Sequence, residues 1–497
     1  IAGVTSVAEA KAGLVTGTAR LGADQIEAGG FDNLSLLVDG ALSFDGNVTL
    51  AMNQSLRLYA GASALSETAG ANSRVSLSAP YVRLAGVTRI GRDGHTLPAV
   101  RWGDSYGRPT QQASDAEFSV TADLIDLRDR VVFGVHQNID TKTSFYSVDR
   151  RGFALVDLTS RGDIRVLRST AFSTPGDITL TAAQIYPATG AGGTITAGYT
   201  DDDRKVLPGS VLTIRRYGDA VPDMPYSAFG LLGLAADTVN QGGVVRAPFG
   251  VLQIGMVSRN GQAQTDAINL LPDSITSVSG AGLVMPYGGT IDGLTYRYDG
   301  SAIVLDGAGG MHSAGPKRGI GFSTTHLNAE AGAVLDLSGG GELIGAGFVS
   351  GRGGSVDILT TPLINSNPGY GYSSKGNAVY AIVPSRAGAY APVVAEAGYG
   401  APLTGQQITI PAGVPGLPAG TYMLMPSSYA LLPGAFRVEL GGNVSPVMTG
   451  AVAAGNGSYV TNATLGIANT AIRASLPNQV TITPAATVRA HSSYNEM

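Results

Sequence analysis

The densest group of chemically capable side chains lies in the segment DLIDLRDR, where Asp123, Asp126 and Asp129 alternate with Arg128 and Arg130. Polysaccharide-cleaving enzymes use paired carboxylates as general acid, base or nucleophile, so this spacing is compatible with glycan hydrolysis. A solvated strand face with cross-strand charge pairs accounts for the same pattern. We favour this second interpretation, which gives the segment no catalytic role.

Other patterns that resemble ligand sites have simpler explanations. The acidic triplet at residues 201–203 suits a hard cation, but it is also typical of a solvated loop tip. Backbone amides at residues 351–354 are able to bind an anion, yet Gly-rich turns occur throughout the chain. No serine stands in a Gly-x-Ser-x-Gly motif beside a suitable histidine and acid. The histidines stand singly and without HExxH spacing, at His95, His136, His312, His326 and His491. The sequence therefore predicts no catalytic residues, no metal site and no cofactor.

Aromatic side chains are the most plausible ligand contacts. Tyrosine combines a flat apolar face with a hydroxyl, which suits sugar rings and partner surfaces. The competing interpretation, which we favour for the tyrosines, is that these rings cover the end of a stacked core. The candidate ligand-binding residues are Trp102, Tyr370, Tyr372, Tyr380, Tyr390 and Tyr399.

The composition of the 497 residues restricts the class of protein. Apolar residues make up 44% and charged residues 14%, which argues against disorder and provides material for a long core. Cysteine is absent, so disulfides, thiol catalysis and Cys-based zinc sites are excluded. A net charge of −5 gives no electrostatic reason to expect a nucleic-acid partner. No run of about 18 apolar residues suggests a membrane-spanning helix.

Short runs of alternating apolar and polar residues recur along the chain, for example at residues 48–52, 55–59, 163–167 and 177–181. Alternation with a period of two indicates strands with one inward and one outward face. These strand–turn units continue without a domain-scale break, and GDIRV at 162–166 resembles GDITL at 176–180. The core-forming residues are small and aliphatic, as stacking of equivalent positions requires. We predict an all-β parallel β-helix, or solenoid, with one or two short helices at most.

The expected domain organisation follows from breaks in this rhythm. Residues 1–364 are predicted to form the β-helix shaft, with extra-helical loops near 97–115 and 201–229. Residues 365–440 are rich in Tyr and Pro and are predicted to form an appended module. Residues 441–497 are predicted to form a further β-rich segment. The chain begins in mid-pattern without a leader-like segment, so we expect an internal fragment of a longer protein.

Several stretches resemble the body of filamentous haemagglutinin-family exoproteins. They are FDNLSLLVDGALSFDG (31–46), VSLSAPYVRL (75–84), SITSVSGAGLVMPYGGTIDG (274–293) and AVLDLSGGG (333–341). The stretch GVPGLPAGTYMLMPSSYALLPGAFRV (413–438) resembles the domain near the C-terminal part of one subgroup of that family. The similarity touches most of the chain, and the last stretch is its most specific part.

The resemblance implies a right-handed parallel β-helix at a bacterial cell surface, exported by two-partner secretion through an outer-membrane transporter. Family members serve as adhesins, biofilm-matrix proteins, haem-acquisition proteins or toxin-delivery shafts. The family's N-terminal secretion domain with its Asn-Pro motifs is not found in this sequence. The resulting hypothesis is a non-enzymatic, secreted or cell-surface adhesin or matrix rod that mediates attachment or cell–cell aggregation. Its expected partners are the transporter, a glycan or cell-surface receptor, and other copies of the chain. The alternatives are the shaft of a contact-dependent toxin-delivery exoprotein and a polysaccharide-degrading β-helix enzyme.

Overall fold

A computed structural model gives the arrangement of most of the chain. The residues that it describes are 19–87, 89–90, 96–97, 114–141, 144–200, 205–258, 260–291, 295–298, 301–303, 319–348, 373, 375–386, 405–444, 450–490 and 493–496.

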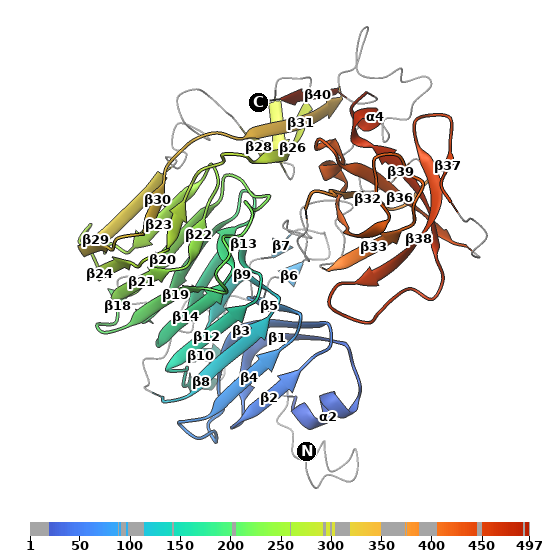
Figure 1. Cartoon of the computed structure of the whole chain (residues 1–497). Coiled ribbons are helices and arrows are strands. Elements are labelled where there is room, and N and C mark those ends of the chain that lie inside the picture. Colours follow the sequence, from blue (N-terminus) through green and yellow to red (C-terminus); the bar gives the residue numbers. More distant parts are fainter. Residues whose placement is uncertain are drawn as a thin grey trace.

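The described chain is all-β and is dominated by one large parallel sheet of 21 strands (Figure 1). The strands stack in three faces, and the chain runs through these faces in turn before it returns to the first. One such passage is here called a circuit, and the strands of each circuit pair in parallel with those of the circuit before it. The expected all-β class with parallel strand pairing is therefore confirmed. Four long strands bend from the first face into the second: β1 (Asn33–Phe44), β3 (Ser55–Leu65), β9 (Leu124–Val132) and β13 (Asp163–Ser173).

The remaining strands of the circuits each belong to one face, apart from one that joins two. The first face adds β5 (Tyr81–Ala85), β15 (Gln184–Pro187), β22 (Val244–Arg246), β25 (Ile275–Ser277) and β30 (Val334–Asp336). The second face adds β16 (Gly192–Thr196), β20 (Leu231–Ala235) and β23 (Val251–Gly255). The third face contains β2 (Val48–Ala51), β4 (Arg74–Ser78), β8 (Glu117–Ala122), β12 (Leu155–Ser160), β14 (Asp177–Ala182), β19 (Val211–Arg216), β21 (Thr238–Gly242) and β24 (Thr265–Leu270). Strand β29 (Gly319–Ala329) pairs with β23 by its first half and with β24 by its second.

The register of these circuits is kept although their lengths differ. Val156 pairs with Ile178, which lies 22 residues later, whereas Ile268 pairs with Leu327, which lies 59 residues later. The extra residues leave the stack at its corners, for instance as the antiparallel hairpin of β10 (Val135–Thr141) and β11 (Ser144–Arg150). Loops on the outside of a stack do not disturb the inward side chains, so insertion there is tolerated.

Further excursions form small sheets of their own. Strands β6 (Arg89–Ile90) and β7 (Thr96–Leu97) pair with each other, as do β17 (Tyr199–Thr200) and β18 (Lys205–Val206). A five-stranded sheet contains β26 (Val284–Ile291), β27 (Thr295–Tyr298), β28 (Ser301–Ile303), β31 (Glu342–Phe348) and β40 (Ser493–Glu496). This sheet joins residues near the chain's end to the top of the stack (Figure 1).

The interior of the stack is built by repetition of apolar residues at equivalent positions. On the third face one such column is fully buried, with Val75, Phe118, Val156, Ile178, Leu212, Val239 and Ile268 at the same register. Five phenylalanines cluster where the second and third faces meet, with ring centroids 5.0–6.3 Å apart: Phe44, Phe118, Phe133, Phe153 and Phe172. Alternation along each strand thus produces a single continuous core.

The two ends of the stack differ among the described residues. Helix α2 (Ala23–Ala28) lies beside the first circuit and places Ile26 against the core. At the other end, the last circuit leaves Leu327 and Leu335 exposed by 47% and 44%. Of the helices in the described segments, none is long and apolar enough to cross a membrane.

The described residues between 379 and 484 form a second structure, here called the antiparallel module. Its strands are β32 (Val379–Ile382), β33 (Gln406–Ile410), β34 (Gly420–Met423), β35 (Met425–Pro426), β36 (Phe436–Asn443), β37 (Val452–Ala453), β38 (Tyr459–Ile467) and β39 (Asn478–Pro484). The 3₁₀ helix η1 (Ser427–Leu431) and helix α4 (Ala485–Ala490) pack at its side.

The module corrects the expected division at residue 440. That boundary falls inside β36, which pairs with β32 on one side and with β39 on the other. The end of β36 and strands β37, β38 and β39 therefore complete the sheet that begins at residue 379. The physical reason is that Phe436 and Val438 before the boundary share a core with Val480 and Ile482 after it.

Candidate functional site

An outward-facing polar column runs along the first face of the stack. Arg57, Arg83, Asp126, Arg165 and Tyr186 occupy the same register position in successive first-face strands. Each is flanked by inward apolar residues, so alternation directs its side chain away from the core. Circuits lie about 4.8 Å apart, which brings neighbouring side chains of the column within hydrogen-bonding reach.

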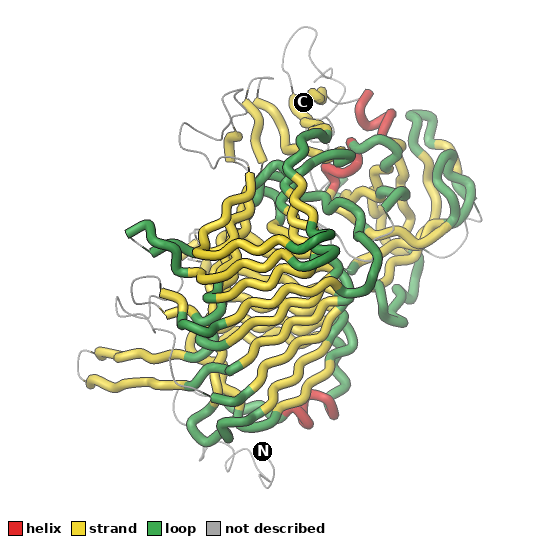
Figure 2. Tube along the Cα trace, turned by 60° about the vertical axis from the view of Figure 1, so that its left-hand side comes forward, coloured by secondary structure: helices red, strands yellow, loops and turns green. Residues whose placement is uncertain are grey.

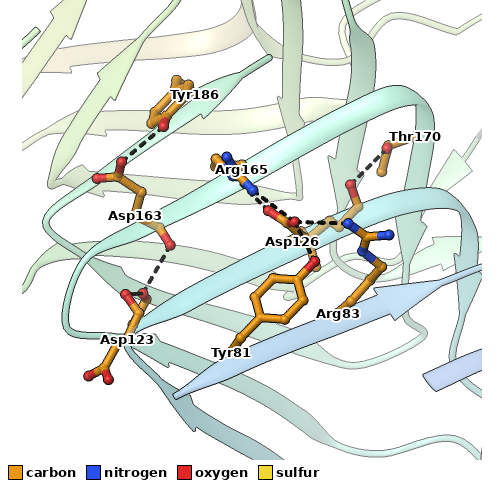
Figure 3. A network of polar contacts seen from close by, with 10 residues as sticks. Tyr81, Arg83, Asp123, Asp126, Asp163, Arg165, Thr170 and Tyr186 are labelled. Carbon is orange, nitrogen blue, oxygen red and sulfur yellow. Dashed lines mark hydrogen bonds and ion pairs between the residues drawn. The ribbon is translucent and has the colours of Figure 1, made fainter. Parts of the chain in front are cut away.

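Asp126 is the centre of this column (Figure 3). Its Oδ1 accepts a hydrogen bond from Arg165 Nε at 2.7 Å, and its Oδ2 accepts one from Arg165 Nη2 at 2.9 Å. Tyr81 Oη donates to Oδ2 at 2.7 Å, and Arg83 Nη2 lies 3.4 Å from the same oxygen. Asp126 is 0% and Arg165 1% exposed, so this two-pronged ion pair is removed from solvent.

The protonation states follow from this geometry. Burial alone would raise the pKa of Asp126, but the charge and hydrogen bonds of Arg165, assisted by Arg83 and Tyr81, hold it below its usual value. Burial and the neighbouring carboxylate raise the pKa of Tyr81 well above that of a free tyrosine. Asp126 is therefore a carboxylate, and Tyr81 a neutral donor, at any pH near neutrality.

A second polar group continues the column towards the last circuits. Tyr186 Oη donates to Asp163 Oδ2 at 2.9 Å, and burial raises the pKa of the Asp163 carboxyl. Arg246 Nη1 donates to Gln184 Oε1 at 2.8 Å and to the carbonyl oxygen of Pro222 at 2.9 Å. The bond to Pro222 attaches the excursion at residues 217–230 to the first face.

The antiparallel module covers this excursion. Arg386 Nη1 donates to the carbonyl oxygen of Met224 at 3.4 Å, and its guanidinium carbon lies 4.6 Å from the Tyr226 ring centroid. The rings of Tyr226 and Tyr429 are 5.4 Å apart. These contacts, with the Arg246–Pro222 bond, join the module to the first face across the excursion.

A separate contact joins the module directly to the stack. Asn469 Nδ2 donates to Asp123 Oδ2 at 2.7 Å, and Arg161 also pairs with Asp123. Asp123 and Asn469 are 346 residues apart in the chain. The module therefore lies against the stack at two places. The column residues from Arg83 to Tyr186 are buried.

The expectation for DLIDLRDR is right in one respect and wrong in another. Cross-strand charge pairs do form, as Asp126 with Arg165 and Asp123 with Arg161. The face is not solvated around Asp126, because Tyr81, Arg83 and Arg165 surround its carboxylate. Asp129 pairs with Arg128 at 3.1 Å in a backbone conformation with φ of 57°, at a bend of β9.

The central carboxylate of this column is out of reach of solvent. Asp126 has all its near contacts on protein groups and no surface in contact with solvent. Within the described ranges no group of three or more His, Asp or Glu side chains is arranged to hold a metal ion. Among the carboxyls on this face, Asp163 has a raised pKa and is the one best suited to proton exchange. Its Oδ2 already accepts a hydrogen bond from Tyr186 Oη.

The aromatic candidates fall mostly outside the described residues. This applies to Trp102, Tyr370, Tyr372, Tyr390 and Tyr399, and also to the Asp triplet at 201–203 and the Gly-rich stretch at 351–354. Tyr380 is described: it lies in β32, is half-buried and packs against the module's core. This position agrees with a packing role for Tyr380.

The sequence-based candidates do not include Tyr81, Arg83, Arg165 or Tyr186. The signal that identifies the last three is a repeated tripeptide with a polar or aromatic centre between apolar residues: VRL (82–84), IDL (125–127), IRV (164–166), IYP (185–187) and VRA (245–247). Aligning these tripeptides places the central residues in one column. What the alignment leaves open is whether that column is exposed.

Comparisons with known proteins give no neighbour for this architecture. No protein-family model, no curated protein and no solved structure matches the chain.

Proposed function

We propose that this chain is part of the shaft of a right-handed parallel β-helix that acts as a non-enzymatic adhesive or matrix rod. The observation that carries the proposal is the polar column of the first face, whose central carboxylate, Asp126, is buried and paired with Arg165. An enzyme that cleaves polysaccharides needs convergent carboxylates that reach a substrate. Both oxygens of Asp126 accept hydrogen bonds from Arg165, and Oδ2 also accepts one from Tyr81, so this buried carboxylate is not placed to reach a substrate.

Right-handed winding is expected on general grounds. Parallel strands in one sheet are joined by right-handed connections in nearly all known proteins, because the twist of the strands favours that hand. Winding in one direction produces a rod with a continuous core and long outer faces. A fold alone does not decide function, and parallel β-helices host both enzymes and binding proteins.

The family proposal is an exoprotein of the filamentous haemagglutinin type, exported by two-partner secretion to a bacterial surface. Two features support it. The chain lacks cysteine, which suits export as an unfolded thread. The segment that most resembles the family, residues 413–438, contributes β34, β35, η1 and the start of β36 to a compact module at the side of the stack.

The test uses beads coated with the purified chain. Bacterial and host cells are incubated with coated beads and with beads coated with heat-denatured chain, and attachment is counted. A parallel incubation with acidic and neutral polysaccharides is analysed for new reducing or unsaturated ends. We expect selective attachment to the native beads and intact polysaccharides.

Released sugar ends that require Asp126 or Asp163 would replace the proposal by an enzyme. Absence of attachment to every cell type, with the chain folded by circular dichroism, would reject the adhesive role.

A further inference from the structure

The third face carries a regular array of small polar side chains. One outward column contains the residue at the same register of nine successive strands: Thr49, Ser76, Ser119, Asp157, Thr179, Thr213, Asn240, Asn269 and Asn328. Eight of these nine are uncharged hydroxyl or amide side chains. The spacing between neighbours is that of the circuits, about 4.8 Å.

A second column runs beside the first. It contains Ser78, Thr121, Thr159, Thr181 and Arg215, each two residues after its neighbour in the first column. Two residues of extended strand advance about 6.6 Å, so the columns form a two-dimensional grid of donors and acceptors. These ten partly or fully exposed positions on β4, β8, β12, β14 and β19 lie on a face with buried residues between them.

The amide end of the grid is already ordered. Asn269 Nδ2 donates to Asn240 Oδ1 at 2.8 Å, and Asn328 Nδ2 donates to Asn269 Oδ1 at 2.8 Å. Each amide has two N–H donors and a carbonyl oxygen that accepts twice. The ladder uses only part of this capacity, so the amides keep bonds for a ligand in a fixed orientation.

Charges on the third face cancel. Arg74 pairs with Glu117 at the edge of the grid. Burial raises the pKa of Asp157, and the positive charge of Arg215 on a nearby strand opposes that shift. A polyanion would meet Asp157 and Glu117 as well as Arg74 and Arg215 and would gain no net attraction, so an uncharged partner rich in hydroxyls matches this face better.

The third face is also open where the first is enclosed. The antiparallel module lies against the first face, and the third-face strands are seen side by side in Figure 2. We propose that the third face binds a neutral, extended polysaccharide chain that lies along the stacking axis. This rests on the proposed adhesive function and names its ligand class and its surface.

The expected mode of binding is many weak contacts in a row. The grid has no aromatic ring in either column, so each sugar contributes only hydrogen bonds, which contribute little individually in water. Repetition makes later contacts intramolecular once the first has formed, so affinity grows with ligand length. Long chains are therefore bound and short oligosaccharides are not.

The test measures retention of the whole chain on an immobilised panel of cellulose, laminarin, galactan and mannan, with soluble heparin as the charged comparison. The variant Thr179→Val/Thr181→Val removes two hydroxyls from adjacent columns and keeps β-branched side chains that favour strands. We expect about tenfold weaker retention on the polymer that binds best, the loss of two hydrogen bonds. Thr409→Val/Thr421→Val, which removes an exposed cross-strand hydroxyl pair from the module, is the matched control and should leave retention unchanged.

Three results would overturn this proposal. The first is no retention on any neutral polymer, and the second is equal retention of the two double variants. The third is that heparin displaces the chain from the polymer at low salt but not at high salt. If cell attachment to coated beads persists in these cases, the proposed adhesive function stands and only its assigned surface and ligand are wrong. If light scattering shows that Thr179→Val/Thr181→Val abolishes self-association instead, the third face binds a second copy of the chain.

Discussion

Replacing Asp126 by Ala removes the carboxylate on which the enclosed column depends. Arg165, 1% exposed, loses bonds of 2.7 and 2.9 Å, and Tyr81 Oη loses its acceptor at 2.7 Å. Removing one partner of a buried ion pair costs about 3–5 kcal/mol because the other charge is left uncompensated. We expect the free energy of unfolding of Asp126→Ala to fall by that amount, measured by urea titration with circular dichroism at pH 7.

A matched control is the exposed ion pair on the third face. Arg74 is 70% exposed by its side chain, and pairs of this kind contribute at most about 1 kcal/mol, so Glu117→Ala should unfold almost as the wild type does. Asp126→Leu combined with Arg165→Met removes both charges of the closest pair and leaves Arg83 as the remaining cation, so it should recover part of the loss. The argument fails if Asp126→Ala costs less than about 1 kcal/mol, or if the combined variant is no more stable than Asp126→Ala.

Acid should act on the same pair. Because the pKa of Asp126 is lower in the folded state than in the unfolded chain, its contribution is complete above the unfolded carboxyl value of about 3.9. That contribution is lost as the pH falls further and passes through the folded value. The stability difference between wild type and Asp126→Ala should therefore shrink below about pH 4 and be constant above about pH 5.

Other substitutions probe different parts of the fold. Because the pKa of Asp163 is raised in the folded state, ionisation of this carboxyl destabilises the fold as the pH rises. Asp163→Asn should therefore be more stable than the wild type at pH 7 and lose this advantage in acid. Urea titrations of both proteins at both pH values measure the difference. Phe118→Ala, in the aromatic cluster, should cost about 3–5 kcal/mol, and a smaller loss would mean that the cluster relaxes around the cavity. A Cβ on Gly250 would lie 2.0 Å from the carbonyl oxygen of Gly230, so Gly250→Ala should lower the melting temperature strongly, whereas Gly192→Ala, with open space at its Cβ, should not.

Much of the architecture follows from local pattern. Alternation at 163–167 and 177–181 predicts strands, and both segments are the starts of strands, β13 and β14. Small aliphatic residues at equivalent positions, such as Val156 and Ile178, predict a core built by stacking. These features are local because a strand's two faces are set by its own backbone.

The excursions are harder to predict from the sequence than the circuits are. The hairpin β10–β11 alternates like the circuits on either side of it, so pattern alone does not separate it from the stack. The division at residue 440 was misplaced for a related reason. The change in composition there lies within one strand, and sheet membership depends on pairing with β32 and β39, which are distant in the chain.

The sequence by itself determined that Arg83, Asp126 and Arg165 point away from the core, since each stands between inward apolar residues. Only the tertiary structure decided that they are buried. Outward on a circuit means towards solvent unless other groups cover the face. Here Tyr81 and the neighbouring side chains of the column surround Asp126. Further along the same face the excursion at 217–230 is bonded to Arg246 and, through Met224, to Arg386 of the module. The third face has the same alternation and stays open. Both faces have the same alternation of inward and outward residues. Long-range packing buries the ion pair on the first face and leaves the third face exposed.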